Sequence, residues 1–159
     1  MSKKDEDISL PGVLKQIETG TQAYRDAAGE LTNRVVKFEE WLSRLPGRVP
    51  ATVWELEDDA SDTYFNLGLQ RDGKQWKLRY WLDNPYDEES WGAGDLRDAS
   101  IETKIRAMAM FPRLLGAIRD SQMEFVKRSA EAAAEFDKFA QLVGIDDTSS
   151  QAKASKGGA

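Results

Sequence analysis

The first third of the chain carries an apolar repeat that alternates intervals of four and three residues. All but one of its positions are apolar, and the repeat consists of Leu10, Leu14, Ile17, Thr21, Tyr24, Ala28, Leu31, Val35, Phe38, Leu42 and Leu45. A spacing that averages about 3.5 residues keeps one stripe of a helix facing one partner along its whole length. We therefore predict one long helix over residues 9–45, capped by Ser9 and ended by Pro46-Gly47, that lies along another helix.

After residue 50 the apolar period changes from that of a helix to that of a strand. Apolar and polar residues alternate over 52–56, 63–71 and 74–82, as in strands with one buried face. Asp72-Gly73 is typical of a two-residue type I′ hairpin turn. This turn would pair Arg71 with Lys74, Leu69 with Trp76, Leu67 with Leu78, and Phe65 with Tyr80. The run over 52–56, which contains Trp54 and Leu56, adds a further strand to this hairpin. Together the three runs predict a three-stranded antiparallel sheet over 52–82.

The rest of the chain is expected to hold a loop and a second long helix. Residues 83–99 are rich in acidic residues, Gly and aromatics and are predicted to be a loop. The apolar repeat returns over 100–143, where we predict a helix with a kink or break at Pro112. The polar ends, 1–8 and 146–159, are expected to be disordered and to flank a single domain over 9–145.

These elements predict an α+β fold of order α-β-β-β-α, in which two long antiparallel helices flank a β-meander and pair as in a coiled coil or bundle. In element order the chain resembles prefoldin-type chaperone subunits and small bacterial secretion chaperones, a resemblance that implies a chaperone-like function. The apolar face of the first helix is wider than a two-stranded seam needs, which favours a homodimer over a compact monomer. The expected dimer interface comprises Leu14, Ile17, Tyr24, Leu31, Val35, Phe38 and Leu42.

Charge and residue usage exclude several function classes. The 159 residues carry a net charge of −6, which disfavours non-specific binding to nucleic acid. The chain contains no Cys and no His, so thiolate chemistry and the commonest general base and metal ligand are absent. The N-terminus lacks the apolar core of a signal peptide, and no run of ~18 apolar residues could cross a membrane. We therefore expect a cytoplasmic protein with no cofactor.

One acidic turn could hold a metal ion. Asp58, Asp59 and Asp62 form a DDxxD pattern, which on a helix gathers carboxylates that can hold magnesium-bound diphosphate. Here the pattern falls between two predicted strands, where Asp is a preferred turn residue. We therefore favour a solvated turn and assign no metal ligand. The sequence also lacks a Gly-rich phosphate-binding motif and a marked nucleophile, so we assign no catalytic residue.

Aromatic residues outside the predicted core are the best candidates for a binding site. Tyr86 and Trp91 lie in the acidic predicted loop, and Tyr and Trp are preferred anchors of protein interfaces. Packing of Trp91 onto the sheet or the second helix is the alternative. The outer face of the sheet should carry Tyr64 opposite Trp81, Asn66 opposite Arg79, and Gly68 opposite Lys77. The predicted partner-binding residues are Trp91, Tyr86, Trp81, Tyr64 and Arg79.

The sequence thus predicts a non-enzymatic protein-interaction module that acts as a chaperone, adaptor or inhibitor. Acidic side chains would attract a basic surface, so the expected partner is a larger protein with a basic patch. Two alternatives stay open. One is a metal-dependent enzyme of phosphate chemistry that uses Asp58, Asp59 and Asp62. The other is a nucleic-acid binder or mimic, which the mixture of aromatic and cationic residues on the sheet allows and the net charge disfavours.

Overall fold

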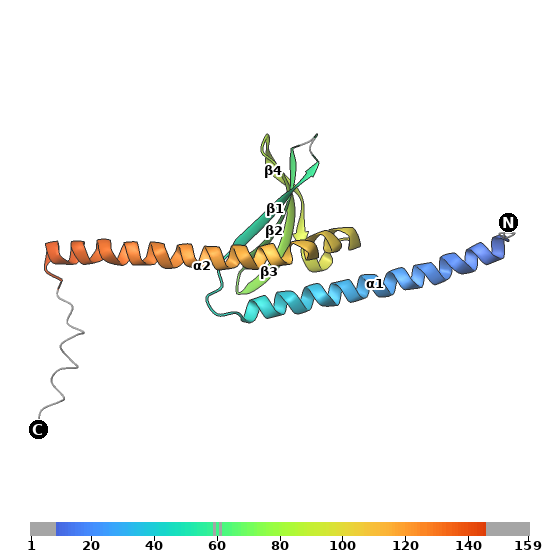
Figure 1. Cartoon of the computed structure of the whole chain (residues 1–159), viewed down its shortest axis with the longest axis horizontal. Coiled ribbons are helices and arrows are strands. Elements are labelled where there is room, and N and C mark those ends of the chain that lie inside the picture. The colour runs from blue at the N-terminus through green and yellow to red at the C-terminus, as the bar shows by residue number, and fades with distance from the viewer. Residues whose placement is uncertain (1–8, 59, 61, 146–159) are drawn as a thin grey trace, which may run out of the picture. The chain divides into compact units, whose positions relative to one another are not determined.

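The computed structural model describes residues 9–58, 60 and 62–145, with side chains for all of these except Asp58 and residues 87–91. The helices and strands follow one another along the chain as labelled in Figure 1. Their bounds are α1 Leu10–Arg44, β1 Ala51–Asp58, β2 Thr63–Asp72, β3 Gln75–Asn84, β4 Asp87–Asp95, the 3-10 helix η1 Leu96–Asp98, and α2 Ile101–Val143. The ends predicted to be disordered, 1–8 and 146–159, lie outside the described residues.

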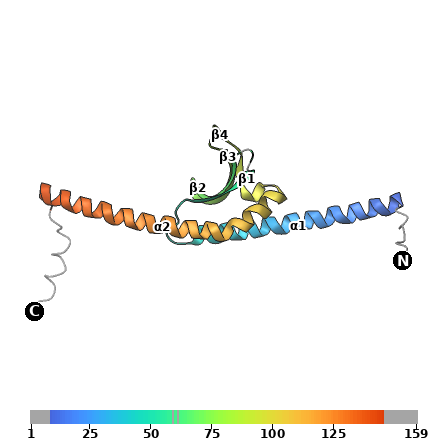
Figure 2. The ribbon, with the colours of Figure 1, turned by 45° about the horizontal axis from the view of Figure 1, so that its top comes forward.

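The chain divides into two units. The first ends at Arg119 and contains α1, the sheet, η1 and the beginning of α2; the second starts at Asp120 and contains the rest of α2. The hydrophobic core lies in the first unit, where the sheet covers α1 and the beginning of α2 (Figure 2). Its fully buried side chains come from both helices, from the sheet and from η1: Val35, Leu42, Leu67, Leu69, Leu78, Leu96, Met110 and Leu114.

The strands form one antiparallel sheet in the order β1-β2-β3-β4, so the prediction of three strands is wrong by one. The segment predicted as a loop over 83–99 contains β4, which pairs with β3 from Arg79–Asp95 to Asn84–Asp87. Two register irregularities interrupt this pairing. The residues of β4 are mostly acidic or Gly, types that strands avoid. Pairing with β3 therefore overrides the local preference of this segment.

The β2–β3 hairpin forms as predicted but in a different register. Asp72 pairs with Gln75, and Leu69 pairs with Leu78, which makes Gly73 and Lys74 the two central turn residues. Gly73 has a φ of +58°, whereas the φ of Lys74 is not positive. A positive φ at the first central residue alone is the pattern of a type II′ turn and not of type I′. The pairing slips by two residues, which is one full period of a strand. Every side chain therefore keeps its predicted face.

Both long helices are confirmed, with bounds close to the predicted 9–45 and 100–143. Pro112 lies inside α2, which continues past it as one helix; of the predicted kink or break, the break is therefore wrong. Ser100 supports the start of α2. The hydroxyl of Ser100 accepts a hydrogen bond from the backbone N–H of Thr103 (3.2 Å) and thereby caps α2.

Within the first unit, α1 and α2 run in the same direction and not antiparallel as predicted. Lys104 of α2 donates a hydrogen bond to the hydroxyl of Thr32 (2.7 Å), and later on both helices Phe111 stacks on Phe38 with ring centroids 4.2 Å apart. The fourth strand explains the error. It carries the chain across the sheet once more than three strands would, so α2 starts from the opposite end.

Candidate functional site

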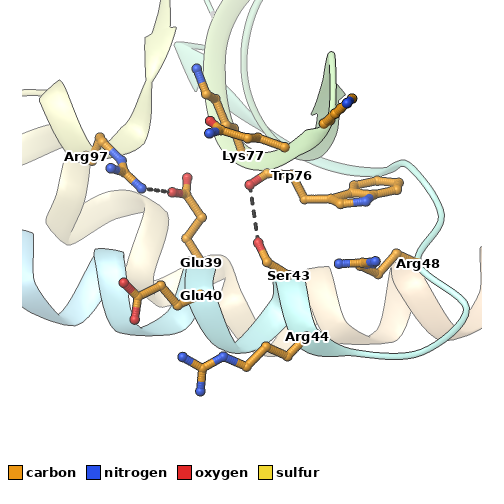
Figure 3. A pocket seen from close by; sticks show the side chains of 10 residues that line it. Glu39, Glu40, Ser43, Arg44, Arg48, Trp76, Lys77 and Arg97 are labelled. Carbon is orange, nitrogen blue, oxygen red and sulfur yellow. Dashed lines mark hydrogen bonds and ion pairs between the residues drawn. The ribbon is translucent and has the colours of Figure 1, made fainter.

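A groove of about 450 Å³ lies where the C-terminal end of α1 meets the β2–β3 hairpin (Figure 3). Most of its side chains are charged, and more of them are cationic than anionic. The lining residues are Glu39, Glu40, Ser43, Arg44, Arg48, Lys74, Gln75, Trp76, Lys77 and Arg97. In a chain with a net charge of −6, this cationic groove is a candidate site that composition alone does not indicate.

Glu39 is the centre of this groove and is only 3% exposed. Its carboxylate accepts a hydrogen bond from the backbone N–H of Leu78 (2.8 Å) and forms an ion pair with Arg97. The pairing of β3 with β4 starts at Arg79, so the N–H of Leu78 finds its acceptor on α1. The hydrogen bond and charge of Glu39 raise the pKa of Arg97. One buried carboxylate thus joins α1, β3 and η1.

Other polar groups of the groove also have partners within the chain. Lys77 forms ion pairs with Asp72 (2.9 Å) and Asp95 (3.3 Å). Its hydrogen bonds to these two carboxylates raise the pKa of Lys77, and the hydrogen bond from Lys77 lowers the pKa of Asp72. Arg48 lies over the ring of Trp76, 6.0 Å from its centroid. The ion pairs of Lys77 join β2, β3 and β4, and the contact of Arg48 with Trp76 holds the segment after α1 against the sheet, so both have a structural role.

The outer face of the sheet, turned away from the helices, has a different character. Trp54 of β1 and Tyr64 of β2 contact each other edge to face, with centroids 5.1 Å apart and planes at 87°. An open pocket of about 250 Å³ lies here, lined by Trp54, Tyr64, Asn66, Asp83 and Pro85. We call it the outer pocket. Its residues come from β1, β2 and β3 and from the position directly after β3, and Trp54 is 56% exposed.

Sequence reasoning missed Trp54 and Asp83 as site residues. Val53 and Trp54 are neighbours in one strand, so only one of them can face the core. Val53 does, opposite Leu67, and Trp54 takes the outer face. The alternation over 52–56 placed Trp54 in a strand but did not indicate which of the two residues faces the core. Asp83 was missed because the predicted register placed Trp81 opposite Tyr64, whereas Asp83 holds that position.

The predicted partner-binding residues divide into three groups. Tyr64, Arg79 and Trp81 lie on the outer face, where Trp81 is opposite Asn66. Trp81 also covers Gly68, because a Cβ at Gly68 would lie 3.0 Å from its ring. Tyr86 lies between β3 and β4 and is 84% exposed. Trp91 lies in β4, where its backbone pairs with Leu82 of β3. The side chain of Trp91 is outside the described part of the structure.

The residues of the predicted dimer interface on α1 are buried in one half of the helix and exposed in the other. Val35 and Leu42 are fully buried in the core of the chain itself, and Leu31 and Phe38 are half-buried. Leu14, Ile17 and Tyr24, in the N-terminal half of the helix, are more than half exposed. Only this N-terminal part presents its apolar stripe to solvent.

The acidic turn lies largely outside the described side chains. The side chain of Asp58 and the whole of Asp59 lie outside the described part, while Asp62 is exposed and has a φ of 50°. Among the described residues, there is no group of three or more His, Cys, Asp or Glu side chains that could hold a metal ion. Of the helices described, neither has a stretch long and apolar enough to cross a membrane.

Comparison with known proteins adds no relative. No protein-family model matches the chain, and no curated protein or solved structure is significantly similar to it.

Proposed function

We propose that the protein is a non-enzymatic protein-interaction module that forms a homodimer through its helices and binds a larger protein partner through the outer face of its sheet. One observation carries the proposal. Leu10, Leu14, Ile17 and Tyr24 follow the spacing of a helix–helix contact, yet they are 70, 52, 58 and 55% exposed. A stripe with this spacing is suited to a second helix, and the first unit leaves this part of it uncovered.

Single exposed apolar side chains are common on proteins, but a continuous stripe of them is typical of an interaction surface. Fully burying a Leu or Ile side chain contributes about 1.5–3 kcal/mol. A second copy would therefore gain several kcal/mol by covering the stripe. The second unit supports the same conclusion, since its own apolar repeat is also exposed at Phe125, Phe136, Phe139 and Val143.

The dimer is tested by sedimentation of the full chain over a range of concentrations. We expect the mass of the unmodified protein to rise towards that of a dimer. The double substitution Leu14→Gln and Ile17→Gln should leave a monomer with unchanged helical circular dichroism. The matched control is Lys15→Gln with Glu18→Gln, which changes two neighbouring exposed residues without changing the net charge. A monomer at every concentration would refute the dimer, as would equal effects of the two variants.

The outer face supplies the second half of the proposal. It combines the exposed ring of Trp54 and the half-buried ring of Tyr64 with the carboxylate of Asp83, and such rings are frequent anchors of protein interfaces. The test is affinity capture from the host lysate with mass spectrometry. A specific partner should be retained by the unmodified chain and by Leu142→Ser, which changes an exposed residue of the second unit. The variant Tyr64→Ser with Tyr86→Ser should lose it, and retention by that variant would contradict the proposed surface.

A further inference from the structure

The outer pocket combines aromatic rings with a carboxylate. Trp54 and Tyr64 stand at right angles, so they form two walls of the pocket. Asp83 lines the same pocket and lies directly opposite Tyr64 in the pairing of β2 with β3. The face of an aromatic ring attracts a cation, and a nearby carboxylate adds to the attraction. None of the described lining residues has a cationic side chain.

The same combination already holds a cation on the inner face of the sheet. Phe65, the neighbour of Tyr64, lies directly opposite Glu55. The guanidinium of Arg106 lies 4.6 Å from the ring centroid of Phe65 and donates a hydrogen bond of 2.5 Å to Glu55. An aromatic residue of β2 and an acidic residue of the adjacent strand thus form a cation site. Tyr64 and Asp83 repeat this arrangement on the outer face.

Within the described part of the chain, no cationic side chain occupies the outer arrangement. Among the described side chains, the cations over aromatic rings are Arg106 over Phe65 and Arg48 over Trp76. None of the described cations forms an ion pair with Asp83. The rings of Trp54 and Tyr64 and the carboxylate of Asp83 are therefore available to a cation from another molecule.

The size of the pocket limits what this cation can be. The volume of the outer pocket, about 250 Å³, is below the usual range of roughly 300–1,000 Å³ for pockets that enclose drug-sized ligands. It therefore suits a single side chain. A nucleotide could also stack on Trp54, but its phosphate would lie near Asp83 on a chain with a net charge of −6. Charge complementarity therefore favours a cationic side chain.

We propose that the outer pocket binds a Lys or Arg side chain of the protein partner, held over the rings of Trp54 and Tyr64 and paired with Asp83. This inference rests on the proposed function for the source of the side chain, but the cation chemistry of the pocket can be tested alone. The protein partner would then be recognised by a protruding basic residue at its interface.

The experiment titrates the full chain with N-acetyl-arginine amide and follows the indole N–H signal of Trp54 by NMR. The signal is assigned by its loss in Trp54→Phe. The matched probe is N-acetyl-citrulline amide, which has nearly the same shape and no charge. We expect arginine to shift the Trp54 signal with millimolar affinity and citrulline to bind at least tenfold more weakly. Equal binding of the two probes would overturn the inference.

Asp83→Asn tests the carboxylate and keeps the size of the side chain. It should weaken arginine binding about threefold to tenfold, whereas Asp26→Asn, the same change on α1, should not. An unchanged affinity in Asp83→Asn would overturn the inference, as would a response of Trp54 to uridine monophosphate and not to arginine. If arginine does not bind but the chain still forms a dimer, only the proposed cation pocket is refuted. Arginine binding by a chain that stays monomeric and captures no protein partner refutes only the proposed function.

Discussion

The two halves of α1 carry one continuous apolar repeat but lie in different environments. In the C-terminal half, Val35 and Leu42 are fully buried beneath the sheet, and in the N-terminal half Leu14 and Ile17 are more than half exposed. The comparison shows that the spacing specifies a stripe that another surface must cover, but not which surface. Contact with the sheet and α2 covers one half, and we propose that a second chain covers the other.

The largest expected effect comes from shortening one leucine in each half. Leu42→Ala should lower the free energy of unfolding by about 3 kcal/mol, because it removes buried methyl groups and leaves a cavity. Leu14→Ala should change it by less than about 0.5 kcal/mol at concentrations where the chain is monomeric. Urea unfolding followed by circular dichroism measures both. Similar losses for the two variants would show that the first unit already covers the N-terminal half.

A second pair of substitutions compares a buried with an exposed carboxylate near the C-terminal end of α1. Glu39→Ala leaves the N–H of Leu78 without its acceptor and Arg97 without its ion pair, so we expect a loss of about 2 kcal/mol. Glu40→Ala, at the next and exposed position, is the control and should cost less than about 0.5 kcal/mol. Equal unfolding midpoints in urea would mean that Glu39 does not join α1 to the sheet.

The elements that sequence reasoning located share a strong period. The repeats of the two helices and the alternation of β2 and β3 each extend over many residues, so their type and approximate bounds could be predicted. The exact hairpin register could not, because Gly73 can be the second central residue of a type I′ turn, after Asp72, or the first central residue of a type II′ turn, before Lys74. Since the resulting slip equals one strand period, the predicted core face of β2 and β3 stayed correct.

The errors concern contacts that a local pattern does not encode. The acidic, Gly-containing residues of β4 form a strand only because β3 offers a free edge, and this extra strand reverses the expected direction of α2. Part of the outer pocket was found, since Tyr64 was placed on the outer face from its alternation alone. Trp54 and Asp83 were missed, because their positions beside Tyr64 depend on the register of three strands.

A third prediction concerns the stability of the exposed half of α1. Gly20 lies inside the helix, and a Cβ added there would meet no atom within 4 Å. Gly20→Ala should therefore stabilise the local helix by about 1 kcal/mol. We expect slower amide hydrogen exchange around residue 20 and an unchanged midpoint of global unfolding, because local opening of an exposed helix is independent of the core. A shift of the global midpoint would show that the two halves unfold together.

The smallest expected effect is the pH dependence of the ion pair beside the buried half. Lys77 lowers the pKa of Asp72, so this carboxylate stabilises the folded state above the ordinary aspartate pKa of about 3.9. Its contribution is lost as the pH falls through the lower pKa of the folded state. The difference in unfolding free energy between the unmodified chain and Asp72→Asn should therefore be steady near neutral pH and shrink below about pH 4. Asp26→Asn, in the exposed half of α1, is the control for the change of net charge. If both variants show the same pH profile, the pairing of Lys77 with Asp72 has no measurable effect in solution, as is common for exposed ion pairs.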